Sequence, residues 1–174
     1  MNYFEFYGIP LSFQVDPTAL KKQFYRLSKK YHPDFYTQES AEKQAEILEL
    51  STLNNKAYKT LSDFDLRMKY ILELEEVLGE EGKNQIPQDF LMEMMDINEQ
   101  LMELEFDFDQ NTHNQVLQAL EQQENQSYQS IASIIDDFEH HPNRAEALKK
   151  IKEYYLKKRY LLRIRKNLDK FASP

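Results

Sequence analysis

The sequence predicts an all-α fold in two domains, and three observations support this prediction. The 174 residues include three Gly and six Pro, although Gly alone normally supplies about 7% of a chain. Phosphate-binding loops, nucleotide folds and hairpin-rich β-folds need several glycines at fixed spacings, so these classes are nearly excluded. Between the breakers lie long stretches of Leu, Glu, Lys, Gln and Ala, which favour helices. Within them, apolar residues recur three and four positions apart, which is the spacing of one buried helical face.

The first domain should begin with a short helix from Tyr3 to Tyr7 and continue with a longer one that starts at Asp16-Pro17. Asp16 offers an N-cap acceptor, and Pro17 takes the first helical position, where a missing N–H costs nothing. This longer helix should run to about Tyr31. Its apolar face consists of Leu20, Phe24, Leu27 and Tyr31.

The opposite side of this helix is almost wholly cationic, since basic residues fill the positions that the apolar face leaves. The chain has a net charge of −8. In such a protein, a concentrated basic face is either ordinary solvated surface or a docking site for an acidic partner. The five cations are Lys21, Lys22, Arg26, Lys29 and Lys30.

Pro33 ends this helix, and the imidazole of His32 can cap its last carbonyls. A second helix should begin at Ser40 or Thr37, and two helices joined by a loop of this length pack as an antiparallel hairpin. The tip of the hairpin then holds His32, Pro33 and Asp34. The apolar side of the second helix consists of Ile47, Leu50, Leu53, Ala57 and Leu61.

A linker is predicted at residues 77–86, after a short helix from about Asp65 to Leu74. Two Gly and one Pro fall within residues 78–87, which makes this stretch the best candidate for a domain boundary. We therefore expect a first domain at residues 1–76 and a second at residues 87–172.

Charge is unevenly distributed along the chain. Residues 84–143 contain 13 Asp and Glu and no Lys or Arg, whereas residues 144–174 contain 11 basic and three acidic residues. We favour the interpretation that a basic last helix lies against acidic helices, so that the two fields largely neutralise each other. Binding of nucleic acid by the basic helix is the less favoured alternative.

Three helices are predicted in the second domain, at about residues 87–108, 112–139 and 144–171. Short connections favour antiparallel neighbours and hence a three-helix bundle. Their heptad-like seams consist of Phe90, Met94, Ile97, Leu101, Leu104 and Phe108 in the first helix, Leu117, Leu120, Ile131, Ile135 and Phe138 in the second, and Leu148, Ile151, Tyr155 and Leu162 in the third.

The first of these helices has more apolar residues than one seam needs. A second apolar face is either core on the far side or a protein-binding surface, on which the adaptable side chain of Met is common. Composition alone leaves both open. This second face consists of Leu91, Met92, Met95, Met102 and Phe106, edged by Asp96, Glu99 and Glu103.

The sequence gives little support to an enzyme or a metal-binding protein. The chain has no Cys, which removes disulfides, thiolate ligands and thiol nucleophiles. A di-iron bundle needs Glu-x-x-His pairs, and the four His residues supply none. The group around Asp136, Asp137, Glu139, His140 and His141 is better interpreted as a polar helix end. We expect no enzyme activity, no cofactor and no bound metal. Without a leader-like N-terminus or an apolar span, we expect a cytoplasmic protein with no membrane partner.

Several segments of the first domain together resemble a J-domain. Tyr31-His32-Pro33-Asp34 follows a basic helix, Asn54-Asn55-Lys56-Ala57-Tyr58-Lys59-Thr60-Leu61 ends the next one, and Arg67-Met68-Lys69-Tyr70-Ile71-Leu72 lies in the last. The resemblance implies that the chain docks on the ATPase domain of a DnaK-class chaperone and stimulates ATP hydrolysis. The implied contact residues are His32, Pro33, Asp34, Lys21, Lys22, Arg26, Lys29 and Lys30. Phe64 departs from the family, since relatives commonly have a proline there, and this leaves the local turn in question.

The whole chain is similar to the HscB family, the co-chaperones of iron-sulfur cluster assembly, in which an acidic three-helix bundle follows the J-domain. Phe90-Leu91-Met92-Glu93 fits a motif of that family. The resemblance implies an HscA-like chaperone and an IscU-like scaffold protein as partners. A general J-domain adaptor for another client is the alternative, with a nucleic-acid-binding protein less favoured, and we expect a monomer. The implied scaffold-binding residues are Leu91, Met92, Met95, Asp96, Glu99, Glu103 and Tyr160.

Overall fold

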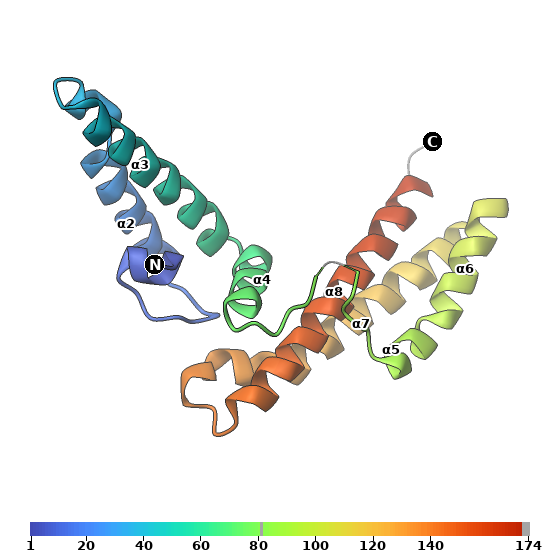
Figure 1. Ribbon diagram of the computed structural model, residues 1–174. Coiled ribbons are helices and arrows are strands. Elements are labelled where there is room, and N and C mark those ends of the chain that lie inside the picture. The colour runs from blue at the N-terminus through green and yellow to red at the C-terminus, as the bar shows by residue number, and fades with distance from the viewer. Residues whose placement is uncertain (81, 172–174) are drawn as a thin grey trace. The chain divides into compact units, whose positions relative to one another are not determined.

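The computed structural model describes residues 1–80 and 82–171, whose regular elements are all helices, with no strand. The all-α prediction is therefore confirmed (Figure 1). The chain forms two compact units, one at Met1–Leu74 and one that begins at Glu75. Residue 81 of the expected linker and residue 172 of the expected bundle lie outside the described residues. None of the described helices is long and apolar enough to cross a membrane.

The first unit is a helical hairpin with short helices at its ends. The hairpin consists of α2 (Pro17–Lys30) and α3 (Ala41–Ser62), which run antiparallel (Figure 1). Helix α1 (Tyr3–Tyr7) precedes the hairpin, the short 3-10 helix η1 (Pro33–Tyr36) follows α2, and α4 (Phe64–Leu74) ends the unit. Asp16 accepts a hydrogen bond from the Thr18 N–H at 2.9 Å, so the predicted N-cap is present.

Asn54 joins three helices of this unit through its buried side chain. Its amide donates to the Phe24 carbonyl (3.1 Å) and to the Ser28 hydroxyl (2.9 Å) on α2. Its side-chain oxygen accepts from the Tyr7 hydroxyl of α1 at 2.8 Å. Burial raises the pKa of Tyr7 well above its ordinary value, because the ionised phenol would lose its hydration there.

Arg67 plays a similar part at the other end of the unit. Its buried guanidinium donates to the Phe13 carbonyl at 2.9 Å and to the Leu61 carbonyl at 2.5 Å, so α4 is bonded to α3 and to the segment before α2. Phe64 is the first residue of α4, after Asp63, whose carboxylate accepts from the Leu66 N–H. At that position a helix leaves the N–H without an internal partner, so Phe and Pro both fit.

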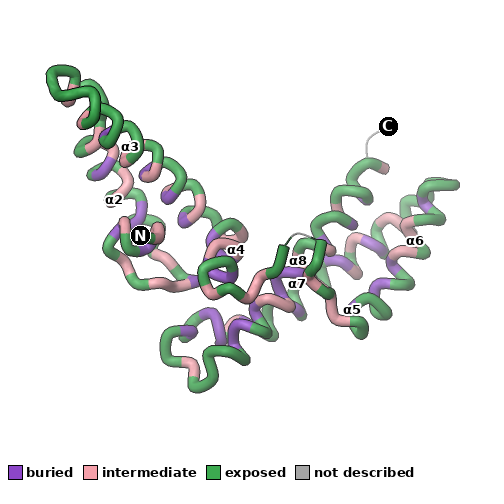
Figure 2. The backbone as a smooth tube through the Cα atoms, viewed as in Figure 1, coloured by how far each residue is buried: buried purple, intermediate pink, exposed green. Residues whose placement is uncertain are grey.

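The second unit is a three-helix bundle. Its first arm consists of α5 (Gln88–Glu93) and α6 (Met95–Phe106). The second arm is α7 (Gln110–Asp136), and the third is α8 (Arg144–Phe171), with the short 3-10 helix η2 (Phe138–His140) between them. Figure 2 shows the buried positions along the inner sides of these helices. A continuous apolar core links them and consists of Phe90, Met94, Ile97, Leu104, Val116, Leu120, Leu161, Ile164 and Leu168.

The first arm differs from the single helix expected at residues 87–108. It is interrupted at the fully buried Met94, where α5 ends and α6 begins. Helix α6 ends at Phe106, since Asp107 is extended and Asp109 already caps α7 by accepting from the Thr112 N–H. Phe108 therefore lies in a link between helices, half exposed, and is not part of a helical seam.

The seam predicted for the last helix is correct in its first half and wrong in its second. Leu148, Ile151 and Tyr155 are buried, but Leu162 is exposed and Leu161 is buried in its place. Leu161 belongs to the core cluster that includes Phe90 and Ile97 of the first arm.

The basic last helix forms a well-defined ion pair with the acidic part of the chain. Arg165 of α8 binds the Glu124 carboxylate of α7 through two nitrogens, at 2.9 and 3.3 Å. Two further cations of α8 pair with carboxylates outside residues 84–143, since Arg144 binds Glu75 and Lys150 binds Glu146.

Candidate functional site

The His32-Pro33-Asp34 tripeptide lies at the tip of the α2–α3 hairpin, as the sequence predicts. Its local hydrogen bonds fix its shape: the His32 Nδ1 accepts from the Asp34 N–H at 3.3 Å, and the His32 carbonyl accepts from the Phe35 N–H at 3.1 Å. The Tyr36 hydroxyl donates to the Lys30 carbonyl at 2.8 Å and ties η1 to the end of α2.

This loop presents charge to the outside. The Asp34 side chain is 84% exposed, so its carboxylate is available to a cationic partner. Because the loop is already held by its own hydrogen bonds, a partner would not have to order it on binding.

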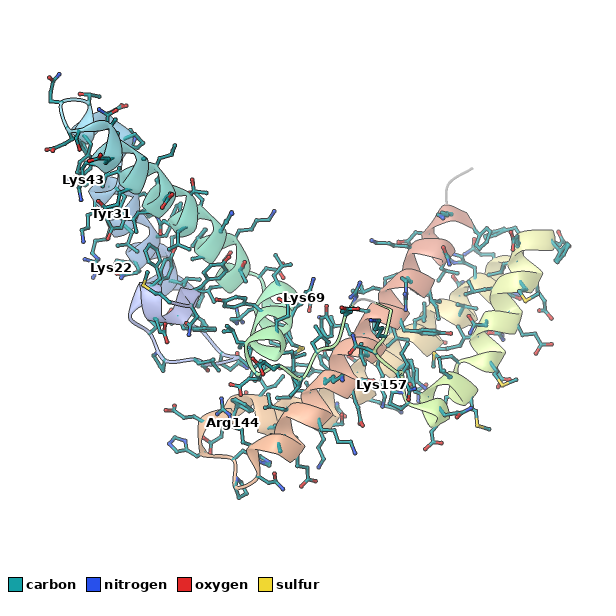
Figure 3. All side chains as sticks on the ribbon, viewed as in Figure 1. Lys22, Tyr31, Lys43, Lys69, Arg144 and Lys157 are labelled. Carbon is teal, nitrogen blue, oxygen red and sulfur yellow. The ribbon has the colours of Figure 1, made fainter. Side chains whose placement is uncertain are left out.

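The five cations of α2 are all exposed. In the described part of the chain, no carboxylate forms an ion pair with any of them. Arg26 donates to the Gln23 side chain, and Lys30 lies over the Tyr31 ring at 4.9 Å. Figure 3 shows Lys22 extending from the side of α2 that faces away from α3. Among the described residues, the cations of this face are therefore not neutralised by a carboxylate. This is compatible with a docking surface for an acidic partner and with ordinary solvated surface.

Two aromatic residues of this region were not predicted as site residues. Tyr25 lies beside Arg26 on the basic side of α2, and Phe35 follows the tripeptide; both are more than half exposed. The signal for Tyr25 was present in the sequence, since an aromatic residue interrupts an otherwise cationic face.

The second apolar face of the first arm is exposed, which decides between core and surface. Met92 and Met95 are 63% and 65% exposed, and Leu91 is 38% exposed. The face also extends farther than the predicted site, because Met102 and Phe106 are exposed on α6. Exposed apolar patches of this kind mark interaction surfaces.

Acidic residues line this face without internal partners. Asp96, Glu99 and Glu103 are exposed on α6, and no Lys, Arg or His among the described residues pairs with them. The surface therefore combines adaptable apolar contacts with a row of negative charge.

Tyr160 differs from the other predicted scaffold-binding residues. It is half buried, its ring packs edge-on against Phe90 at 5.5 Å, and its hydroxyl accepts from the Asn98 side chain at 2.8 Å. Figure 3 shows the neighbouring Lys157, whose ammonium lies 5.5 Å from the Phe90 ring, in the same part of α8. Tyr160 thus holds α8 against the first arm, and the structure does not group it with the freely exposed Leu91, Met92 and Met95.

The polar end of α7 shows no metal-binding geometry in the described residues. His140 bonds the Asp137 carboxylate at 2.7 Å, and this hydrogen bond raises the pKa of His140. His140 and Asp137 thus bond to each other at an exposed helix end, which agrees with the interpretation of this group as a polar helix end.

Two family models match the chain. The DnaJ domain model covers residues 2–70, and the model described as the HSCB C-terminal oligomerisation domain covers residues 86–169.

Similar proteins carry related names. The chain is 38% identical over 103 residues to "Co-chaperone protein HscB homolog" of Vibrio cholerae, which aligns 58% of this chain and about 60% of that relative's length. It is 37% identical over 126 residues to "Co-chaperone protein HscB" of Buchnera aphidicola, covering 70% of this chain and 69% of the relative. A Vibrio campbellii homologue is 34% identical over 137 residues, with 71% and 80% covered.

Solved structures agree with these sequence matches. The crystal structure of the human co-chaperone protein HscB gives a TM-score of 0.74 at 26% identity and covers 100% of this chain and 83% of that one. Chaperone HscB from Vibrio cholerae gives 0.61 at 25% identity, with 97% and 99% covered.

Proposed function

The chain belongs to the HscB family of J-domain co-chaperones, and from this premise we propose that it couples two partners. Its first unit stimulates ATP hydrolysis by a DnaK-class, HscA-like chaperone. Its second unit holds an IscU-like scaffold protein of iron-sulfur cluster assembly and delivers it to that chaperone. In this proposal, residues 1–76 bind the chaperone and residues 87–172 bind the scaffold.

One observation supports this proposal above the others: the chain carries two exposed surfaces of different chemistry. The hairpin tip offers the Asp34 carboxylate beside a row of cations. The first arm of the bundle offers Met and Leu beside a row of acids. A protein that joins two different partners needs two such unlike surfaces.

The test is single-turnover ATP hydrolysis by the chaperone, measured with this chain, with the scaffold, and with both. We expect the combination to accelerate hydrolysis more than either component alone. Equal stimulation with and without the scaffold would favour the alternative, a general J-domain adaptor for another client. Salt-dependent retention on nucleic acid, without any stimulation, would favour the nucleic-acid-binding alternative.

The proposal includes a cytoplasmic setting and no catalytic activity of the chain's own, since its curated relatives are named as co-chaperones. The C-terminal model's description as an oligomerisation domain supports the additional proposal that the bundle can associate with further copies. This addition departs from the monomer expected from the sequence.

A further inference from the structure

The most exposed large apolar side chain of the described residues lies at the end of the first arm. Phe106, the last residue of α6, is 89% exposed, and Met102, one turn before it, is 62% exposed. The Asp107 N–H donates to the Glu103 carbonyl at 3.0 Å, so the last turn of α6 is closed and carries Phe106 on a regular helix. Neither Met102 nor Phe106 belongs to the scaffold-binding residues that the family resemblance implies.

These two residues continue the exposed face that includes Met95. Met95, Met102 and Phe106 follow one another at seven and four residues, so at about 100° per residue they fall within an arc of about 40°. Buried Ile97 and Leu104 lie on the opposite side of α6. We call the three exposed side chains the apolar strip. It extends over about 16 Å at a rise of 1.5 Å per residue, and Figure 2 shows exposed positions up to the end of α6.

The two edges of the apolar strip differ. Along one edge lies the acidic row, which consists of Asp96, Glu99 and Glu103. On the other edge, the Asn98 side chain donates to the Tyr160 hydroxyl of α8 at 2.8 Å, so this edge faces α8. The strip is therefore bordered by negative charge on one side and by α8 on the other.

A hollow of about 360 Å³ lies between α6 and α8 on this second edge. Its apolar lining is continuous with the bundle core, because Leu101 and Phe171 are partly buried against that core. Glu105 and Lys170 also line it, and neither forms an ion pair in the described part of the chain. The hollow is large enough for an aromatic or branched side chain of a partner. Its lining consists of Leu101, Met102, Glu105, Asn167, Lys170 and Phe171.

We propose that Met102, Phe106 and this hollow form a second contact area for the scaffold, which we call the distal contact. The proposal rests on the proposed function, since its occupant is the scaffold that the bundle holds there. One segment of the scaffold covers the apolar strip from Met95 to Phe106 and inserts an apolar side chain into the hollow. That segment has apolar side chains along one face and Lys or Arg along the edge that meets the acidic row.

Continuity and charge favour the scaffold as the occupant. A partner that covers Met95 and pairs with Glu103 comes within one helical turn of Phe106, because Glu103 and Phe106 are three residues apart. The acidic row repels an anionic lipid surface or a nucleic acid. A basic amphipathic segment of a protein fits both the apolar strip and the acidic row, as in other complexes in which such a segment binds a helical surface.

Truncation of the two exposed side chains is the first test. Met102→Ala with Phe106→Ala should weaken scaffold binding at least about tenfold in calorimetry, and circular dichroism should show the wild-type helicity. Stimulation of the chaperone at saturating scaffold should remain at the wild-type level. The control is Leu162→Ala, which removes an exposed apolar side chain of α8 outside the hollow and should leave the affinity unchanged.

Filling the hollow tests its part separately. Asn167 is exposed, so a larger side chain at this position need not disturb the core. Asn167→Trp should weaken scaffold binding, because the indole occupies the space that the scaffold side chain needs. Asn167→Ala leaves the hollow open and should bind as wild type does. Equal affinity of these two variants would remove the hollow from the distal contact.

A single introduced thiol identifies the occupant directly. The chain has no Cys, so Phe106→Cys can carry one environment-sensitive dye, attached before the scaffold is added. Scaffold should shift the emission to shorter wavelength, whereas the same dye at Leu162→Cys should not respond. A shift on addition of unlabelled copies of this chain, with no response to scaffold, would make a second copy the occupant and overturn the proposal.

Two outcomes separate this proposal from the co-chaperone function. If the Leu91, Met92 and Met95 triple-Ala variant loses scaffold affinity while the Met102→Ala, Phe106→Ala variant keeps it, the distal contact is wrong and the proposed function stands. If the wild-type chain does not bind the scaffold at all, both are wrong.

Discussion

The two units present their proposed binding surfaces by opposite means. In the first, the exposed surface is a short loop at the end of a hairpin whose helices are joined by the buried Asn54, while the buried Arg67 bonds α4 to α3. In the second, the exposed surface is the far side of an amphipathic arm whose near side, with Phe90 and Met94, belongs to an apolar core.

The two surfaces therefore tolerate different kinds of substitution. A loop that works through its shape depends on hydrogen bonds some distance away, because these align the helices that carry it. An apolar face depends on the side chains that it exposes and little on the polar groups beneath. Substitutions in the two units should therefore act in different ways.

His32→Gln should remove stimulation of the chaperone ATPase, with a loss of about 30-fold or more, as for a central contact residue. The change affects the loop alone, so helicity and scaffold affinity should remain at wild-type values. Single-turnover hydrolysis, circular dichroism and calorimetry are the measurements. His140→Gln, at an exposed histidine of the second unit, is the matched control. Full stimulation by His32→Gln would contradict the assignment of the loop.

Asn54→Ala should destabilise the first unit by about 2–4 kcal/mol, because buried partners on α1 and α2 lose their hydrogen bonds. Denaturant unfolding followed by a probe in each unit should show the second unit unaffected. The control is Asn55→Ala at the exposed neighbour of Asn54. It should lower the free energy of unfolding by less than about 0.5 kcal/mol. If both variants unfold at the same denaturant concentration, the buried network does not position the hairpin.

Leu91→Ala, Met92→Ala and Met95→Ala together should weaken scaffold binding about tenfold, or about 1.4 kcal/mol, without unfolding the bundle. Calorimetry measures the affinity, and circular dichroism tests the fold. Leu48→Ala with Leu66→Ala removes exposed apolar side chains from the first unit and should leave the affinity as it is. An unchanged affinity for the triple variant would remove this face from the scaffold site.

The smallest effect concerns alkaline pH. Burial raises the pKa of Tyr7 above its ordinary value of 10.0, so the folded state favours the neutral phenol. Stability from this preference is fully present below about pH 10 and is lost as the pH rises above it. The free energy of unfolding of the first unit should therefore fall between pH 10 and 11. The slope should be smaller in Tyr7→Phe; an equal slope would assign the effect to other groups, such as Tyr70.

Local signals allowed the hairpin and its tip to be predicted from the sequence. Asp16-Pro17 marks the start of α2, and Pro33 marks its end. Both boundaries depend on interactions among neighbouring residues, which can be recognised in the sequence. The place of the tripeptide in the fold follows from those boundaries.

Other features depend on contacts between distant residues and could not be predicted. The interruption at Met94 has no Gly or Pro to mark it. Whether Leu161 or Leu162 faces the core depends on contacts with the distant first arm and α7, since Leu161 packs in one cluster with Ile97 and Leu120. Exposure of Met92 and Met95 could be decided only once the core was known, because composition fits core and surface equally well.

The exposed methionines make the two surfaces unequal toward oxidants. Met92, Met95 and Met102 are open to solvent, whereas Met68 and Met94 are buried, and the chain has no Cys that could react first. Conversion to the sulfoxide turns an apolar side chain polar. Mild peroxide should therefore weaken binding of the proposed scaffold to the bundle, whereas stimulation of the proposed chaperone by the hairpin tip should persist.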